Sequence, residues 1–230
     1  MSFRTNRFVL MLRDMGRALG LNKLIANYLL GDGYEMRYDR QFADALHQGD
    51  CVWDVGANVG YYTRLFSERI GMQCHVLAFE PSPVNFVRLT EACAAMGNVT
   101  LHHFGLGKED GQLHFQQGAD DLGATSRIVE AGADATVVDI RSATSVINGG
   151  GQMPNAIKID VEGFEYEVLE GLGEYIKNPA LHLMGIEVHF GILKERGIPQ
   201  VPELIETLLQ RNGFTVSWPD SSHIIALRNN

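Results

Sequence analysis

Two acidic residues, with a glycine turn between them, form the part of the sequence best suited to bind a small ligand. The apolar run Cys51–Val55 contains Asp54 and leads into the turn Gly56-Ala-Asn-Val-Gly60. A second apolar run ends at Glu80, about twenty residues after the last glycine, which is the usual distance to the acid that binds ribose hydroxyls. Glycine lets a backbone approach a ligand closely, and Asn tolerates left-handed dihedrals. This spacing predicts a site for a nucleotide-like cofactor at the carboxyl ends of two strands.

The residues of this turn discriminate between two kinds of cofactor. A dinucleotide phosphate needs the spacing Gly-x-Gly-x-x-Gly, and here Asn58 stands where the middle glycine would be. Asp54 would repel a pyrophosphate and would suit a cationic ligand. S-adenosylmethionine carries a ribose, an ammonium and a sulfonium, but no phosphate. The residues therefore favour S-adenosylmethionine over NAD, and a turn with only a structural role is the third interpretation.

From Cys51 onward, apolar runs alternate with stretches of helical spacing, which is typical of a doubly wound α/β sheet. The predicted strands are Cys51–Val55, His75–Glu80, Val99–Phe104, Ala156–Asp160 and Leu181–Glu187, followed by a terminal hairpin of Phe214–Trp218 and His223–Leu227. The predicted helices are Tyr61–Ile70, Pro83–Met96, Ile140–Ile147, Glu165–Gly173 and Glu203–Arg211. Two further strands are possible at Leu113–Phe115 and Thr136–Val138. The polar loop Asp120–Arg127 between them would either cover an acceptor or be a solvated connection.

The first 48 residues are predicted to be a helical appendage and a possible lid, and residues 49–230 the cofactor-binding domain. Phe8–Leu12 is too short an apolar run to span a membrane, and Arg13 and Asp14 interrupt it. A helix that lies on a membrane surface is the alternative to one packed on the domain. We expect the packed helix and no stable membrane insertion. The residues around Phe42 and Ala45 predict another helix before the first strand.

Composition limits the classes of function. The chain has 230 residues, 45% of them apolar, and a formal net charge of −9, which argues against nucleic acid as a partner. The three cysteines Cys51, Cys74 and Cys93 lie in or beside predicted core elements, so we expect buried free thiols and a cytoplasmic, reducing compartment. No cysteine pair has the spacing of a structural zinc site.

Four blocks of the sequence, in the correct order between about Asp50 and Trp218, resemble FkbM-type methyltransferases. They are Asp54–Thr63, Phe79-Glu80-Pro81, Ile157–Gly171 and Gly185–His189. The resemblance implies a class I, Rossmann-like methyltransferase with a mostly parallel sheet, a C-terminal antiparallel hairpin and S-adenosylmethionine as its cofactor. Members of this family commonly methylate hydroxyls of sugars, polyketides or other secondary metabolites, and S-adenosylhomocysteine is the product.

Carried over by position, the resemblance also implies a set of cofactor-binding residues. The methionine and ribose end of the cofactor would be lined by Asp54, Gly56, Ala57, Asn58 and Gly60. Glu80 would hold the ribose, Pro81 and Ser82 would lie near the adenine, and Asp160 would close the site. Many class I enzymes have an Asp or Asn after the third strand, where this chain has Phe104-Gly105-Leu106. The adenine is therefore expected to rest on backbone groups at Gly105 and on apolar contacts.

Asp160, Glu162, Glu187 and His189 end two strands that are predicted to be neighbours, and residues two apart on a strand share one face. A hydroxyl acceptor has to lose its proton, so a base or a metal is expected near the methyl group. We predict that His189 is the base, oriented by Asp160 or Glu187. A divalent ion bound by the carboxylates and His189, or a purely structural cluster, remains open, and no metal is predicted.

Two other functions remain open from the sequence: an NAD-dependent oxidoreductase and a noncatalytic cofactor-binding module. For a methyltransferase, we expect a small-molecule or glycan acceptor. The sequence predicts neither the identity of that acceptor nor the oligomeric state.

Overall fold

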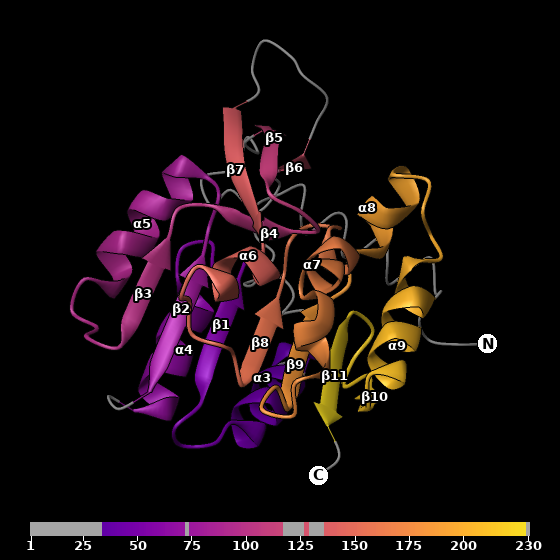
Figure 1. Ribbon diagram of the computed structural model, residues 1–230, viewed down its shortest axis with the longest axis horizontal. Helices are drawn as coiled ribbons and strands as arrows, with labels where there is room; N and C mark the ends of the chain where they lie inside the picture. Colours follow the sequence, from indigo (N-terminus) through magenta and orange to yellow (C-terminus); the bar gives the residue numbers. More distant parts are fainter. Residues whose placement is uncertain (1–33, 72–73, 117–126, 129–135, 229–230) are drawn as a thin grey trace.

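The computed structural model describes residues 34–71, 74–116, 127–128 and 136–228, and its centre is a seven-stranded sheet (Figure 1). The strand order is β10-β11-β9-β8-β1-β2-β3. The strands are β1 Cys51–Val55, β2 His75–Phe79, β3 Val99–His102, β8 Ala156–Ile159, β9 Leu183–Glu187, β10 Phe214–Ser217 and β11 His223–Arg228. The run from β9 to β3 is parallel, whereas β11 is antiparallel to both β9 and β10. The predicted parallel sheet with a terminal hairpin is confirmed.

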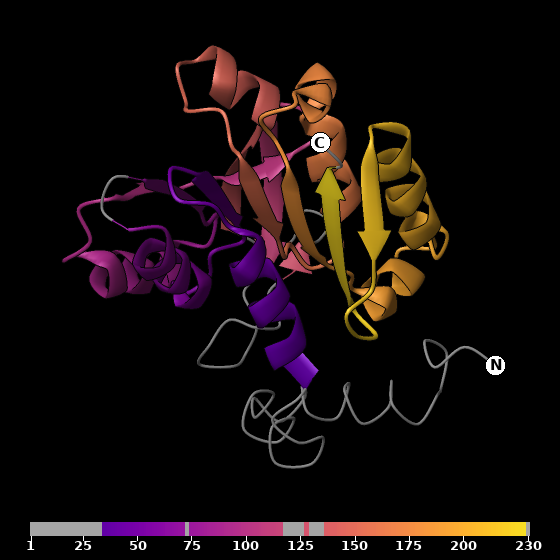
Figure 2. The ribbon, with the colours of Figure 1, turned by 90° about the horizontal axis from the view of Figure 1, so that it is seen from below.

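Helices cover both faces of this sheet, as Figure 2 shows. One face carries α3 Tyr34–Ala45, α4 Tyr61–Ile70 and α5 Pro83–Cys93, and the other carries α6 Ala143–Asn148, α7 Glu165–Gly171 and α9 Val201–Arg211. The short elements η2 Gly173–Lys177 and α8 Phe190–Glu195 complete the set in the described part of the chain. Successive side chains of β1 point to opposite faces of the sheet. Val52 therefore packs with the cluster under α3 and α4, whereas Trp53 and Val55 pack with the cluster under α7 and α9.

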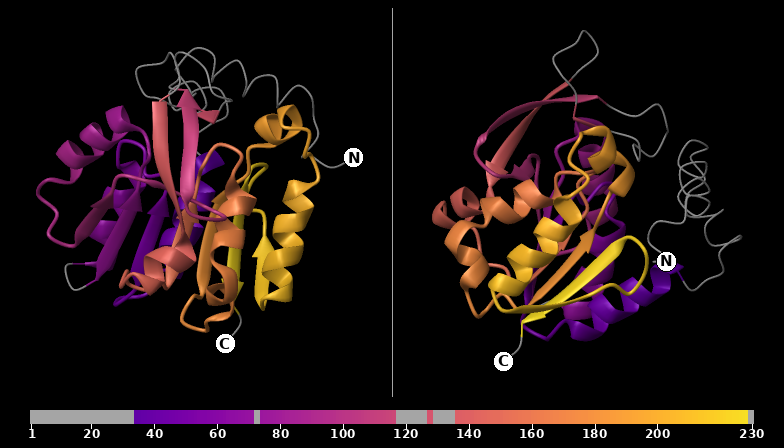
Figure 3. Two further views of the ribbon diagram at one scale, coloured as in Figure 1. Left: turned by 45° about the horizontal axis from the view of Figure 1, so that its top comes forward. Right: turned by 90° about the vertical axis from the view of Figure 1, so that its right-hand side faces the viewer.

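A second, smaller sheet stands above the carboxyl ends of the parallel strands (Figures 1 and 3). Its strands are β4 Gly105–Gly107, β5 Gly111–Gln116, β6 Arg127–Ile128 and β7 Thr136–Ser142, in the order β4-β7-β5-β6. The two short strands predicted here are confirmed as parts of β5 and β7. The prediction did not anticipate a separate sheet, whose first strand directly follows β3.

Two predicted boundaries are wrong in this region. The strand predicted to run to Phe104 ends at His102, and the helix predicted over Ile140–Ile147 begins only at Ala143. Burial in β7 alternates with a period of two, since Val138, Ile140 and Ser142 are buried, so these residues form a strand. The Ser142 hydroxyl then accepts a hydrogen bond from the Ser145 amide and caps α6.

Other boundaries differ by a few residues. The helix predicted to reach Met96 ends at Cys93, and the strand predicted from Leu181 begins at Leu183. The sequence analysis also missed α8, whose six residues are too few to show a clear helical period.

Helix α3 is an integral layer of the domain. Tyr38 and Phe42 are each only 1% exposed, and Phe42 packs against Phe66 of α4. Their close approach to β9 requires a glycine at position 185, where a Cβ atom would lie 2.3 Å from the Tyr38 hydroxyl oxygen. Of the appendage and possible lid predicted over residues 1–48, residues 1–33 lie outside the described residues, as do the loop residues 120–126. Among the described helices, none is long and apolar enough to cross a membrane.

The burial of Phe42 gives the first testable prediction. Phe42→Ala should lower the free energy of unfolding by about 3–5 kcal/mol, because it leaves a cavity between α3 and the sheet. The exposed Val87 is the control, and Val87→Ala should change stability by less than about 0.5 kcal/mol. Denaturant unfolding of both variants measures the difference. Equal, small effects would mean that α3 is an appendage and not a core layer.

Candidate functional site

The turn after β1 has the left-handed backbone that its sequence suggested. Gly56, Asn58 and Gly60 have φ angles of 79°, 50° and 89°. A Cβ atom at Gly56 would lie 1.8 Å from the carbonyl oxygen of Asp160, so glycine is required where the turn crosses the end of β8. A Cβ atom at Gly60 would lie 2.9 Å from a Leu89 methyl on α5. The two glycines thus allow close packing of the chain on itself.

Glu80, at the end of β2, is held by the same turn. The Asn58 amide donates to Glu80 Oε2 and the Ser82 amide donates to Glu80 Oε1, each at 2.8 Å. The side chain is buried, and this burial raises the pKa of Glu80 to about 7, although the two amides and Lys158 act in the opposite direction. Each oxygen still has a lone pair to accept a ligand hydroxyl.

A cavity of about 350 Å³ opens between this turn, the second sheet and the ends of β8 and α7. Six of the predicted cofactor residues line it: Gly56, Asn58, Glu80, Pro81, Gly105 and Asp160. The Asn58 and Asn85 side-chain oxygens at its wall are buried and have no hydrogen-bond partner among the described residues. The size suits a small-molecule ligand, and the two amide oxygens are available to a donor on it.

The other predicted cofactor residues lie behind the cavity wall. Ala57 packs with Leu89 and Cys93 in a small apolar cluster. The Ser82 hydroxyl caps α5 by accepting from the Asn85 amide. Asp54 is 0% exposed and accepts a hydrogen bond of 2.6 Å from the Thr63 hydroxyl. Neither Asp54, Ala57, Gly60 nor Ser82 is among the residues that line the cavity.

Lys158 is the central residue that the sequence analysis missed. Its Nζ atom lies 3.4 Å from Asp54 Oδ1 and 3.4 Å from Asp160 Oδ2, and it donates to the Gly56 carbonyl at 3.2 Å. Burial lowers the pKa of Lys158, but Asp160 and Asp54 outweigh that effect and leave the pKa above its usual range. A lysine between Ile157 and Ile159 in a strand predicted to be buried was the available signal, because a buried charge needs a partner.

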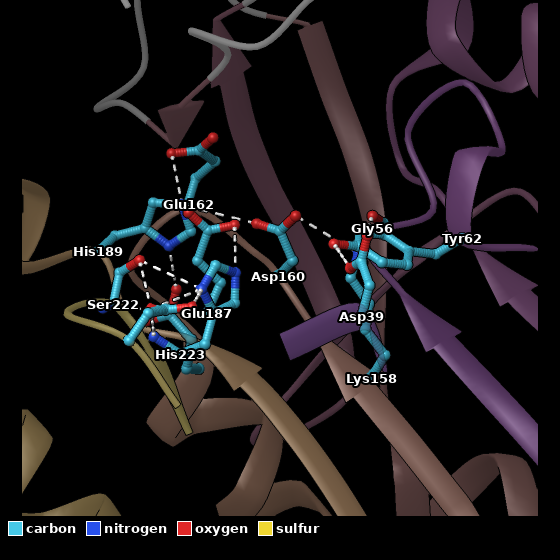
Figure 4. Close-up of polar contacts among 12 residues, drawn as sticks. Asp39, Gly56, Tyr62, Lys158, Asp160, Glu162, Glu187, His189, Ser222 and His223 are labelled. Atoms are coloured by element: carbon cyan, nitrogen blue, oxygen red, sulfur yellow. Dashed lines mark hydrogen bonds and ion pairs between the residues drawn. The ribbon is translucent and has the colours of Figure 1, made fainter. Parts of the chain in front are cut away.

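The carboxylate–histidine cluster lies beside Asp160 and is built from the ends of β8 and β9 (Figure 4). His189 is 1% exposed, and its Nε2 atom lies 3.5 Å from Asp160 Oδ1, 3.3 Å from Glu162 Oε2 and 3.9 Å from Glu187 Oε1. The predicted grouping of Asp160, Glu187 and His189 is therefore present. The residue that orients the ring is different: Glu165 Oε1 lies 2.6 Å from His189 Nδ1, whereas Asp160 and Glu187 face Nε2.

The carboxylates determine the charge of His189. Burial by itself favours the neutral ring, but Glu162, Glu165 and Glu187 together raise the pKa of His189 to about 10. In the site as described, His189 is therefore an imidazolium at neutral pH.

A second buried histidine supports Glu187 from the terminal hairpin. His223 Nε2 lies 3.6 Å from Glu187 Oε2, and its Nδ1 lies 2.9 Å from Asp220 Oδ2. Burial lowers the pKa of His223, but the hydrogen bonds to Asp220 and Glu187 raise it well above its ordinary value. The ring stacks on Tyr38 of α3, with centroids 4.3 Å apart. Helix α3 thus contacts the group that holds Glu187.

Comparison with known proteins identifies the family of this chain. Residues 54–216 match the methyltransferase FkbM domain. The chain belongs to the FkbM methyltransferase family. The hexuronic acid methyltransferase AglP of Haloferax volcanii is 31% identical to it over 154 residues, which cover 66% of this chain and 62% of that protein. Methyltransferase 1 of Beauveria bassiana is 27% identical over 193 residues, which cover 72% of each chain.

Solved structures confirm the class I methyltransferase fold of this FkbM chain. A protein assigned as an rRNA-methylase, from Clostridium thermocellum, superposes with a TM-score of 0.54, at 12% identity, over 85% of this chain and 94% of that one. A chain of the fibrillarin/Nop5p complex superposes with a TM-score of 0.50, at 16% identity, over 80% of this chain and 75% of that one. At these identities the likeness concerns the fold alone.

The pairing of Lys158 with two carboxylates predicts a specific pattern of stability in this FkbM chain. Lys158→Met should lower the free energy of unfolding by about 3–5 kcal/mol, because it leaves Asp54 buried without a counter-charge. Adding Asp54→Asn should restore part of that loss, because the uncompensated charge is then gone. Denaturant unfolding of the two single variants and the double variant measures the coupling. Additive losses would contradict a direct interaction between the two side chains.

Proposed function

We propose that this FkbM-family chain transfers the methyl group of S-adenosylmethionine to a hydroxyl of a sugar, with a hexuronic acid or a related metabolite as the acceptor. The observation that carries the proposal is the position of Asp160. Asp160 lines the same cavity as Glu80, and it also belongs to the cluster around His189. A cofactor site and a group able to handle a proton therefore meet at one residue.

The cavity residues fit the cofactor that the family implies. Glu80 presents two carboxylate oxygens, already positioned by backbone amides, to the two hydroxyls of a ribose. Asn85 and Asn58 offer the two buried amide oxygens that have no partner among the described residues, and these suit donor groups on the ligand. Gly105 packs between Pro81 and Ile140 and leaves an apolar wall for an adenine ring. When bound, S-adenosylmethionine supplies a methyl group on an electrophilic sulfonium.

The acidic end of the cavity suits a positively charged donor. Asp160 lies where the cavity meets the cluster, and Lys158 holds one of its oxygens from behind. Asp54 acts indirectly and does not contact the ligand. It neutralises Lys158, which in turn holds Asp160 and the Gly56 carbonyl. Binding a cation at this end is favoured because the carboxylates of the cluster outnumber its cationic groups.

The acceptor hydroxyl has to lose a proton as its oxygen attacks the methyl carbon. We propose that the coupled set His189, Asp160 and Glu187 takes up this proton, with a carboxylate as the accepting group because His189 is already protonated. Glu165 fixes the ring of His189 through Nδ1, so that Nε2 points at the carboxylates. The rest of the chain's contribution is alignment, because the rigid ends of β8 and β9 hold these groups beside the cavity.

A sugar acceptor is supported by the relative named as a hexuronic acid methyltransferase. The small sheet β4-β7-β5-β6 rises beside the cavity and provides a wall for an acceptor larger than the cofactor. The alternatives of an NAD-dependent oxidoreductase and a noncatalytic module are not favoured by the family match. The three described cysteines are free thiols, which supports a reducing, cytoplasmic compartment.

The role of Glu80 is tested by cofactor binding. Glu80→Ala should weaken binding of S-adenosylhomocysteine by about 2–4 kcal/mol, the sum of two hydrogen bonds to a charged group. Affinity in the unaltered protein should also fall as pH drops below about 7, the pKa of Glu80, because a protonated carboxyl no longer accepts two hydroxyls. Calorimetry between about pH 6 and 8 measures both effects, since the charges of the ligand are constant there.

The exposed Glu91 of α5 is the control for this experiment, and Glu91→Gln should leave affinity unchanged at every pH. If Glu80→Ala bound as well as the unaltered protein, or if affinity were independent of pH, Glu80 would not hold the ribose.

The activity itself is tested with S-adenosylmethionine carrying a labelled methyl group and a panel of uronic acids, neutral sugars and glycans, read by mass spectrometry. We expect methyl transfer to at least one hydroxyl of this panel. His189→Gln should lower that turnover by about a hundredfold, the usual scale for loss of a proton-transfer group, while cofactor affinity changes little. The control is His75→Gln, at an exposed position on β2, which should retain full turnover. Full activity of His189→Gln would reduce the cluster to a structural role.

A further inference from the structure

We propose that Asp160, Glu162 and His189 form a binding site for one divalent metal cation at the acceptor end of the cavity. Each residue offers one ligand atom, and these atoms all lie within 4.8 Å of one another. The role that we give this cation in catalysis rests on the proposed methyl transfer, whereas its binding can be tested without that reaction.

The spacing of the ligand atoms matches a coordination sphere. Neighbouring ligands on an octahedral ion with bond lengths of 2.0–2.6 Å lie roughly 2.9–3.7 Å apart. His189 Nε2 lies 3.5 Å from Asp160 Oδ1 and 3.3 Å from Glu162 Oε2. These two distances fall within that range, and the third pair, Asp160 with Glu162, lies within 4.8 Å, so the two carboxylates can approach a shared ion by side-chain rotation.

The surroundings of His189 are those of a metal-ligating histidine. A histidine that binds a metal donates its other ring N–H to a carboxylate or carbonyl, which fixes the tautomer and the ring orientation. Here Glu165, at 0% exposure, accepts at Nδ1 over 2.6 Å and also accepts from the Gly163 amide at 2.8 Å. The other ring nitrogen, Nε2, points at the carboxylates of Asp160, Glu162 and Glu187.

The charge of the surrounding network also calls for a cation. Successive ion pairs of at most 4.0 Å join six carboxylates to three cationic groups. The carboxylates are Asp54, Asp160, Glu162, Glu165, Glu187 and Asp220, and the cationic groups are Lys158, His189 and His223. A metal ligand has to be neutral at Nε2, so with His189 neutral and His223 protonated these described groups carry four negative charges in excess. A divalent ion bound at the site offsets half of that excess.

The site is reachable from the cavity. Asp160 and Glu162 both line it, and their side chains are 27% and 30% exposed, whereas His189 is buried behind them and does not line the cavity. A second group with suitable spacing, His47, Asp50 and His182, lies at the opposite, amino-terminal end of β1. There His182 Nε2 already lies 3.0 Å from Asp50, whose carboxylate also accepts from the His47 amide, so that group supplies a control and not a competing proposal.

The donor set of two carboxylates and one imidazole suits a hard ion such as Mg²⁺ or Mn²⁺. A cation there would bind the acceptor hydroxyl and lower its pKa, so that the oxygen attacks as an alkoxide. Its proton would leave to a carboxylate of the cluster, the new C–O bond would replace the methyl–sulfur bond, and S-adenosylhomocysteine would be the leaving group. For a uronic acid acceptor, the cation would also bridge the acceptor carboxylate to a site that otherwise repels it.

The test uses the full chain and Mn²⁺ alone, with calorimetry and the electron paramagnetic resonance signal of the free ion as readouts. We expect one bound Mn²⁺ per chain, and Glu162→Gln should weaken it by at least the roughly 10–100-fold that loss of an outer-shell partner costs. His47→Gln, which alters only the control group, should leave the affinity unchanged. Glu162 is preferred to His189 for the variant because its removal leaves no buried charge unpaired.

Binding of S-adenosylhomocysteine to each variant shows that the fold and the cofactor site persist, and it separates this proposal from the proposed function. If the protein bound S-adenosylhomocysteine but no Mn²⁺, or if Glu162→Gln bound both ligands unchanged, the metal site would be refuted and the methyltransferase proposal would stand. If Mn²⁺ binding were lost in His47→Gln instead, the ion would belong to the other group and the proposal would be overturned.

Discussion

The site depends on one buried ammonium group. Lys158 lies on β8 with its Nζ atom between Asp54 of β1 and Asp160, and it also donates to the Gly56 carbonyl. Two pieces of chain that are far apart in sequence are joined there: the end of β1 with the glycine turn that follows it, and the end of β8. The buried carboxylate of Asp54 and the partly exposed carboxylate of Asp160 would repel each other without a cation between them. The missing Cβ of Gly56 then allows the turn to cross the Asp160 carbonyl.

From this junction the chain builds two regions that share Asp160. On one side, the Asn58 amide of the turn donates to Glu80, and the turn lines the cavity that we assign to the cofactor. On the other side, β8 and β9 end in the carboxylates that surround His189, and His223 from the terminal hairpin supports Glu187. Because both regions rest on strand ends within one sheet, their separation is fixed by strand pairing and not by loops. Methyl transfer, in which alignment carries much of the rate, suits such a frame.

Much of this arrangement could be predicted from local patterns. The run to Asp54, the glycine turn and Glu80 are close in sequence, and the period of two along the parallel strands is strong. Three long-range contacts could not be predicted in the same way: Lys158 with Gly56, Glu165 with His189, and His223 with Glu187. They join residues that are distant in sequence, since Lys158 lies 102 residues from Gly56. The need for glycine at position 56 also depends on a distant residue. The sequence suggested that a ligand requires this glycine, whereas in the fold the backbone of Asp160 requires it. The second sheet was missed because β4 has only three residues.

The most direct test of this account is a crystal structure of the protein with S-adenosylhomocysteine and Mn²⁺, in which the anomalous signal locates the metal. We expect the ribose hydroxyls on Glu80, the homocysteine sulfur near Asp160, and one anomalous peak between Asp160, Glu162 and His189. A cofactor bound outside the cavity beside Glu80, or a ligand sulfur remote from Asp160, would contradict the claim that Asp160 joins the two regions of the site.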